Sequence, residues 1–165
     1  LRGQFAMWAG AVLDPHKDIA LIAEPGTEDE ALTRLRRIGF DGQVGHLGGG
    51  MAALKGFPSL VTGSRRVEPN ELRPWMARAD APVVIDVRRH DEHATGTISG
   101  SRSVPLQVLG KSLADLPRDR DIVVHCAGGY RSAIAASLLA ANGFHVADLI
   151  GGYSAWKEAA AGVGS

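Results

Sequence analysis

The sequence predicts an α/β fold in which a parallel sheet is flanked by helices on both faces. Apolar runs of strand length alternate along the chain with helical stretches, the order typical of parallel sheets. A strand–turn–helix–strand–turn–helix pattern also occurs twice, in residues 18–54 and in residues 121–156. Because only the second pattern is preceded by a further helix and strand, we predict two domains: a truncated, degenerate, cysteine-free copy over residues 1–58 and a complete domain over residues 59–165.

The elements of the first copy follow from its hydrophobic pattern. The apolar run IALIA, residues 19–23, predicts a buried strand, and the helical stretch EALTRLRRIGF follows the turn EPGTED. A short strand then ends in a double glycine. The sequence MAAL begins another helix, in which we interpret Met51 as a core anchor. The segment KGFPSLVTGSRR, residues 55–66, is rich in Gly, Pro and Ser and predicts a linker.

The second copy contains more elements than the first. VEPNELRPWMARAD, residues 67–80, predicts a capped helix, and PVVIDV, residues 82–87, predicts a central strand. An irregular stretch follows as far as SVPL, residues 103–106. Further along, IVVHC, residues 122–126, predicts a buried strand, which the turn AGGYRS connects to the helical AIAASLLAANGF. A second double glycine precedes the last helix, where we interpret Trp156 as a core anchor.

Composition excludes several classes of protein. The 18 basic residues balance the 18 acidic ones, so neither nucleic acid nor an anionic membrane is expected as the main partner. No apolar run reaches the length of about 18 residues needed for a spanning helix, and LRGQFAMWAG lacks the order of a signal peptide. A single cysteine fits a reducing compartment, so we expect a cytoplasmic protein. Since residue 1 is Leu, we expect a processed product or part of a longer chain.

The single cysteine, Cys126, lies where a predicted buried strand turns into a helix. Ligands bind open α/β sheets at this edge, and the helix N-terminus supplies free N–H groups. Gly128 and Gly129 allow the turn to form an anion-binding nest, which favours the nucleophilic thiolate. A free cysteine is also often a small buried apolar residue. The two glycines, the helix start and Arg131 favour the nucleophile here.

The first copy keeps the scaffold of this turn but not its reactive groups. Aligning the two patterns pairs Ala23 with Cys126, Gly26 with Gly129, and Glu28 with Arg131. The first copy therefore lacks both the thiol and the arginine.

These residues resemble the rhodanese (sulfurtransferase) family. CAGGYRS at 126–132 matches the family's Cys-x-x-Gly-x-Arg-Ser loop, and Asp86-Val87-Arg88 with Glu92 is similar to its Asp-Val-Arg…Glu segment. GTISGS followed by VPL, and later the double glycine with its tryptophan, resemble further motifs in the family's order. The resemblance covers about residues 67–160, with two departures: Thr97 replaces the usual His, and His93 stands where an aromatic residue is common.

The resemblance implies a rhodanese-type sulfurtransferase without a cofactor or a bound metal. The Cys126 thiolate would attack a sulfane sulfur and pass it, as a persulfide, to a thiol or other acceptor. Arg131 would brace the loop by pairing with Asp86 or Glu92, with Arg88 in support. The remaining loop residues that would contact substrate are Ala127, Gly128, Gly129, Tyr130 and Ser132.

The uncharged loop favours a low-molecular-weight or protein persulfide over the thiosulfate dianion as the donor, in sulfide or persulfide metabolism. One alternative is a non-enzymatic sulfur carrier or docking module of a larger persulfide-processing protein. A cysteine phosphatase is disfavoured, because its loop would be one residue longer. His90 and His93 show no zinc-site spacing. Paired units whose first copy lacks cysteine also resemble the C-terminal part of bacterial fusions with a metallo-β-lactamase-fold persulfide dioxygenase, so such an upstream domain is an expected partner.

Overall fold

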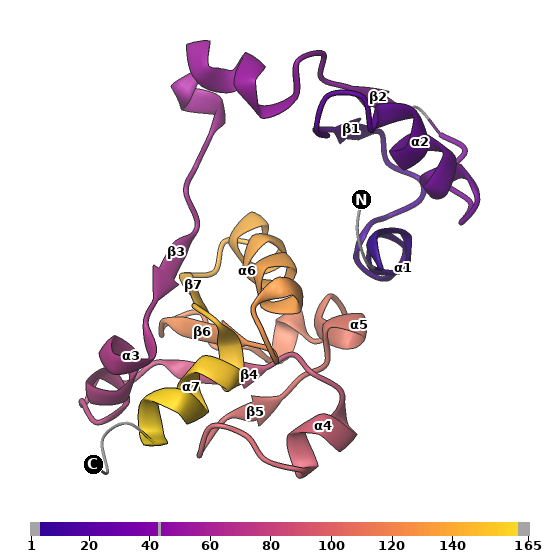
Figure 1. Cartoon of the computed structure of the whole chain (residues 1–165). Helices are drawn as coiled ribbons and strands as arrows, with labels where there is room; N and C mark the ends of the chain where they lie inside the picture. The colour runs from indigo at the N-terminus through magenta and orange to yellow at the C-terminus, as the bar shows by residue number, and fades with distance from the viewer. Residues whose placement is uncertain (1–3, 43, 162–165) are drawn as a thin grey trace. The chain divides into compact units, whose positions relative to one another are not determined.

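A computed structural model of the chain describes residues 4–42 and 44–161. It divides into two compact units, Leu1–Gly63 and Ser64–Ser165, each of which is described by itself (Figure 1).

The second unit is built on a five-stranded sheet in the order β3-β7-β6-β4-β5. Every pair of neighbouring strands is parallel. This architecture confirms the predicted α/β class, and β6 is its central strand. The strands are β3 (Arg65–Val67), β4 (Val83–Asp86), β5 (Arg102–Ser103), β6 (Ile122–His125) and β7 (Val146–Leu149).

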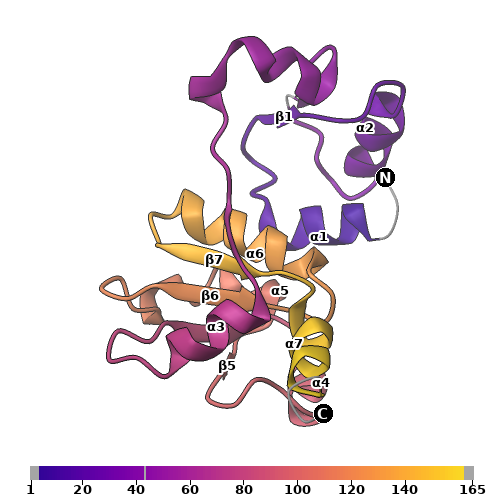
Figure 2. The same ribbon diagram turned by 60° about the vertical axis from the view of Figure 1, so that its left-hand side comes forward.

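Helices cover both faces of this sheet, as Figures 1 and 2 show. On one face lie α3 (Pro69–Met76) and α7 (Gly152–Ala161), and on the other lie α5 (Leu106–Leu109) and α6 (Tyr130–Ala141). The short α4 (His90–Ala94) follows β4. Two faces have to be covered because the strands of a parallel sheet carry apolar side chains on both sides.

In the core beneath α3 and α7, alternate side chains of the strands pack against the helices on that face of the sheet. Val123 of β6 and Ala147 of β7 are fully buried with Leu72 of α3, and Trp156 of α7 packs against this cluster as predicted. Burial of a leucine-sized side chain stabilises the fold by about 2 kcal/mol. Residues one position along each strand point to the opposite face, toward α6. One of these is the buried carboxyl Asp148.

The predicted capped helix is α3. Pro69 occupies its first turn, and the Glu71 carboxylate accepts a hydrogen bond of 2.9 Å from the Glu68 backbone N–H. Such a capping box satisfies donors that the helix itself leaves free.

Two segments of the second unit are more regular than predicted. The edge strand β3 begins inside the predicted linker and ends one residue beyond it. The sequence did not reveal this strand, because its parallel pairing of Arg65 with Ala147 is a contact between distant residues that leaves no periodicity in the sequence. The stretch predicted to be irregular contains α4 and β5.

The first unit contains a two-stranded parallel sheet. Helix α1, which the sequence did not predict, packs with α2 on this sheet: Ala9, Leu35 and Phe40 form a cluster joined by Ile19 and Val44. The elements are α1 (Phe5–Val12), β1 (Ile19–Leu21), α2 (Glu28–Arg36), β2 (Val44–His46), and the 3-10 helices η1 (Gly50–Gly56) and η2 (Pro58–Leu60).

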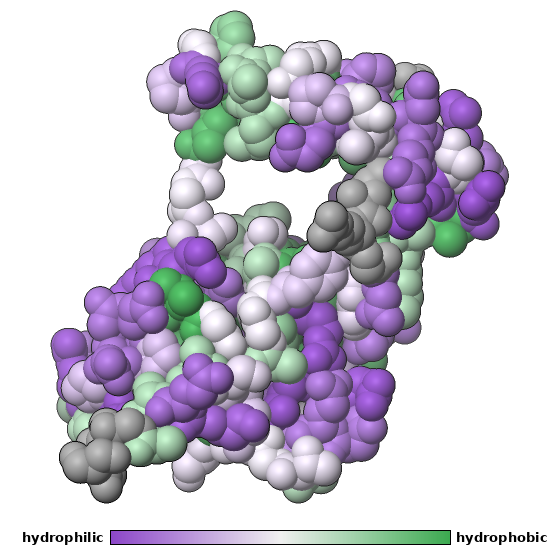
Figure 3. All heavy atoms as spheres, viewed as in Figure 1, coloured by the Kyte–Doolittle hydropathy of each residue, from purple (hydrophilic) through white to green (hydrophobic). Residues whose placement is uncertain are grey.

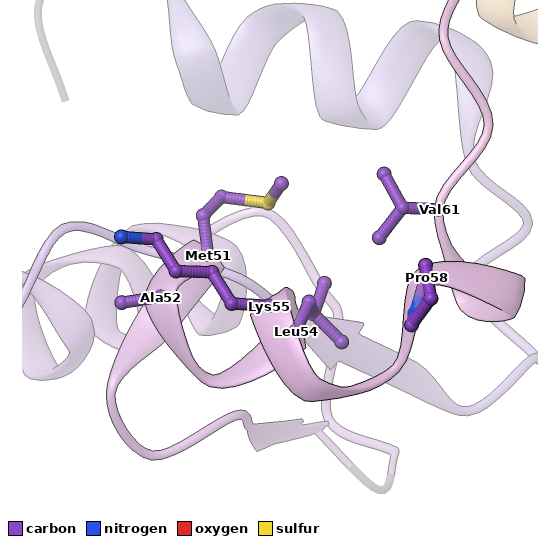
Figure 4. Close-up of a pocket in the computed structure, with 6 residues that line it drawn as sticks. All are labelled: Met51, Ala52, Leu54, Lys55, Pro58 and Val61. Atoms are coloured by element: carbon purple, nitrogen blue, oxygen red, sulfur yellow. The ribbon is translucent and has the colours of Figure 1, made fainter.

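Two predictions for the first unit are wrong. IALIA is not a buried strand: Ala20 is exposed and Ile22 is 45% exposed, because the described residues cover only one face of a two-stranded sheet. Met51 is not a core anchor, since it is 59% exposed and lies on a 3-10 rather than an α-helix. It lines an apolar hollow of about 580 Å³ together with Leu54 and Val61 (Figure 4). Figure 3 shows apolar side chains gathered over this segment.

Candidate active site

Cys126 lies immediately after β6, in the turn that leads into α6, and is 1% exposed. Gly129 caps α6 with φ 106°, a left-handed conformation that glycine adopts without strain. Its backbone N–H faces the thiol, with Gly129 N 3.1 Å from Cys126 Sγ, and the Ser132 hydroxyl oxygen lies 3.5 Å from the same sulfur. The turn therefore presents hydrogen-bond donors to the sulfur.

The start of α7 holds the other side of this turn. The Tyr153 N–H donates to the Cys126 carbonyl at 2.7 Å, and the Ser154 N–H donates to the Ala127 carbonyl at 3.0 Å. Gly152 permits this approach: at φ 59°, a Cβ there would lie 2.5 Å from the Cys126 carbonyl oxygen. The second double glycine thus serves close packing of α7 against the cysteine loop.

Arg131 pairs with Glu92. Its Nη1 and Nη2 donate to the two Glu92 carboxylate oxygens at 2.7 and 2.8 Å, a bidentate arrangement. This hydrogen bonding lowers the pKa of Glu92 and raises the pKa of Arg131 above its ordinary value. Of the two acids that the sequence left open as partners, the structure places Glu92 beside Arg131.

Asp86 lies at the end of β4 and is fully buried. Arg88 Nη2 donates to it at 2.6 Å, Thr97 Oγ1 at 2.9 Å, and His93 Nδ1 lies 3.1 Å from Oδ2. Burial by itself would raise the pKa of Asp86, but the Arg88 hydrogen bond and the other donors hold it well below its usual range. Among the described residues no hydrogen bond joins Asp86 to Cys126 or Arg131. The carboxylate instead organises the segment between β4 and β5.

His125, next to the thiol in sequence, is fully buried. Neither ring nitrogen has a hydrogen-bond partner among the described residues, although Nε2 lies 3.9 Å from Asp86 Oδ2. Desolvation lowers the pKa of His125 to about 4 despite the attraction of this carboxylate. The imidazole is therefore neutral at pH 7.

The other predicted site residues surround the turn or support it. Gly128 and Tyr130 are exposed at the rim, whereas Ala127 is partly buried. The Arg88 guanidinium donates to the Gly96 carbonyl at 2.7 Å and stacks on the Tyr153 ring, 4.6 Å from its centroid.

Sequence reasoning missed the contribution of three residues. His93 and Thr97 both bond to Asp86, and their departures from the family pattern were the available signal. No signal pointed to the Tyr153 N–H, because its role depends on how α7 packs. In the part of the chain that the structure describes, no group of three or more His, Cys, Asp or Glu side chains could hold a metal ion. No helix within the same part is long and apolar enough to cross a membrane.

The fold and the site define an α/β domain with a single buried cysteine held in a strand–helix turn at the carboxyl edge of a parallel sheet. The sequence profile of the rhodanese-like domain matches residues 68–159, so the chain belongs to the rhodanese-like family.

Its relatives include sulfurtransferases. The chain is 30% identical over 93 residues to a sulfurtransferase of Allochromatium vinosum, a match that covers 56% of this chain and 87% of the relative. It is 33% identical over 94 residues to the thiosulfate sulfurtransferase GlpE of Ectopseudomonas mendocina, covering 56% and 84%. A crystal structure of a rhodanese-related protein from Thermoplasma volcanium is similar at 33% identity and a TM-score of 0.54, covering 58% of this chain and 92% of that one.

Proposed function

We propose that this chain is a sulfurtransferase in which Cys126 carries a sulfane sulfur from a persulfide or thiosulfate donor to a thiol acceptor. The observation that carries the proposal is the Gly129 N–H, which faces Cys126 Sγ at 3.1 Å in a turn braced by Arg131 and Glu92. We place the activity in the cytoplasm, where a single free thiol stays reduced.

The transfer has two balanced steps. The Cys126 thiolate attacks the outer sulfur of a donor R–S–S⁻; a new S–S bond forms, the donor S–S bond breaks, and R–S⁻ leaves. With thiosulfate, the leaving group is sulfite. An acceptor thiolate then attacks the outer sulfur of the Cys126 persulfide, and Cys126 leaves as thiolate. Backbone N–H groups of the loop stabilise the terminal sulfur anion between the two steps.

The loop side chains favour a persulfide over thiosulfate as the donor. Ala127, Gly128, Gly129 and Tyr130 carry no charge, and the Arg131 guanidinium is already paired with Glu92. A dianionic donor therefore gains little attraction there. The GlpE relative is named a thiosulfate sulfurtransferase, so both donors belong in the test.

The first unit is, in this proposal, a degenerate copy of the second half of the domain. The register supports this: β1 and β2 pair Ile19 with Val44, and β6 and β7 pair Ile122 with Val146, at positions that the alignment of the two copies makes equivalent. The glycine contact also recurs, because a Cβ on Gly50 would collide with the Ala23 carbonyl oxygen.

In the turn of this degenerate copy, a carboxylate of the same chain accepts the backbone hydrogen bond. The Gly26 N–H, which aligns with that of Gly129, donates to the Glu28 carboxylate at 2.6 Å. Glu28 thus fills the place of an anionic ligand, and Ala23 offers no thiol. We assign the first unit a structural or docking role, with a metallo-β-lactamase-fold persulfide dioxygenase domain of the parent chain as its proposed partner.

The test is the intact mass of the protein after incubation with glutathione persulfide or thiosulfate, followed by turnover with a thiol acceptor. Wild type is expected to gain one sulfur atom and to release it to the acceptor, whereas Cys126→Ser should do neither. Transfer by Cys126→Ser would overturn the assignment. A sulfur adduct without turnover would favour the alternative of a passive sulfur carrier or docking module.

A further inference from the structure

Helix α4 carries Glu92, the carboxylate that holds Arg131, yet it is only five residues long. A single helical turn is unstable by itself, because nucleation costs more than so few hydrogen bonds return. The position of Glu92 must therefore come from contacts that tie α4 to the rest of the domain.

Two histidines of α4 make such contacts. His90 Nδ1 lies 2.7 Å from the Ser103 hydroxyl, but this pair is exposed to solvent. His93 Nδ1 lies 3.1 Å from Asp86 Oδ2, and the side chain of His93 is 24% exposed while that of Asp86 is fully buried. Water competes less for the second contact, so it restrains the helix more strongly.

The direction of the His93 bond is set by its partner. Asp86 is ionised and can only accept, so His93 Nδ1 carries the hydrogen and donates. The other groups facing this carboxylate are Arg88, Thr97 and His125, none of which lies on α4. Among the described residues, His93 alone joins α4 to Asp86.

We propose that His93 is a positioning residue that anchors α4 to the buried Asp86 and so places Glu92 to hold Arg131 against the Cys126 loop. The links are short and continuous: 3.1 Å from His93 to Asp86, one peptide bond from His93 to Glu92, and 2.7 Å from Glu92 to Arg131. Glu92 also accepts the Arg89 backbone N–H at 3.2 Å, which aligns its carboxylate with the helix start. This inference rests on the proposed function, whose reaction the loop would perform.

The test compares two substitutions of His93. In His93→Asn the side-chain amide nitrogen can stand near the place of Nδ1 and donate to Asp86, whereas His93→Phe keeps the ring volume and removes the donor. His93→Phe is expected to lower kcat for sulfur transfer about tenfold with little change in KM, since an interaction with the reacting loop and not with the acceptor is lost. His93→Asn should restore most of that rate, and the exposed control His90→Ala should leave it unchanged.

A second measurement separates this inference from the proposed function. Solvent exchange of the Arg131 guanidinium N–H protons, followed by ¹⁵N NMR, should be faster in His93→Phe than in wild type and His93→Asn, whether or not the protein transfers sulfur. Equal exchange and equal kcat in wild type and His93→Phe would overturn the positioning role. Equal defects in the Phe and Asn variants would also overturn it, because the hydrogen bond would then not be the cause.

Discussion

Acid will destabilise the second unit through His125 before the paired carboxylates of Asp86 and Glu92 titrate, because their hydrogen bonds to arginine lower the pKa of each. Burial lowers the pKa of His125 to about 4, from an ordinary value of 6.5. As pH falls below 6.5, the unfolded chain binds a proton at this residue while the folded protein does not. The contribution of neutral His125 to the free energy of unfolding is therefore fully present above the pKa of the unfolded chain, and it is lost as pH falls toward 4.

The size of the loss follows from the two values. A difference of about 2.5 pKa units corresponds to about 3 kcal/mol in total. About 2 kcal/mol of this falls between pH 7 and pH 5, because in that interval the folded imidazole remains almost entirely neutral. His125 is fully buried, so solvent does not screen the effect.

The assay is urea denaturation at pH 7 and pH 5 of wild type and two variants. His125→Phe removes the titrating group and the two ring nitrogens that lack partners. Between pH 7 and pH 5, the free energy of unfolding of this variant should fall by about 2 kcal/mol less than that of wild type. His145→Gln changes an exposed histidine and should keep the wild-type pH dependence. Asp148, whose pKa burial raises, is present in all three proteins, so its contribution of opposite sign cancels in the comparison. The same pH dependence in wild type and His125→Phe would refute the reasoning.

Three further predictions concern the cysteine loop, the packing of α7 and the first unit. Arg131→Lys should lower both turnover and the alkylation rate of Cys126 by about tenfold, or about 1.4 kcal/mol, because Lys cannot form the bidentate pair; wild-type values for both would show that the pair is dispensable. Gly152→Ala should destabilise the fold by about 2 kcal/mol in urea denaturation, against little change for Gly110→Ala, whose Cβ meets open space; equal stabilities would contradict the close packing of α7. Combining Cys126→Ser with Ala23→Cys should yield no sulfur transfer in the thiol-acceptor assay, and a rate near wild type would show that the first unit's turn still accepts an anion.

Local sequence determined the class of fold and the position of the cysteine turn. The alternation of apolar strands with helical stretches is a property of neighbouring residues, and it predicted the parallel sheet with helices on both faces. The cysteine turn could be predicted for the same reason, since Cys126, Gly129 and the start of α6 are contiguous in the chain. The capped helix α3 likewise depends on residues within one turn of each other.

Tertiary structure alone decided the contacts between residues distant in sequence. Asp86 and Glu92 were equal candidates for pairing with Arg131, and the choice depends on how α4 folds back beside α6. The tie from His93 to Asp86 and the edge strand β3 depend in the same way on packing that no local pattern encodes.

The first unit shows that a hydrophobic pattern by itself does not determine whether a strand is buried. An apolar run predicts a buried strand only if other elements cover both of its faces, and the described residues cover one face of β1 and β2. Ala20 and Ile22 are therefore exposed although their pattern resembles that of the buried Val123 and its neighbours in β6. Hydrophobic pattern specifies which segments can be buried, whereas the number of packed layers decides which of them are, because burial is a property of the assembled fold.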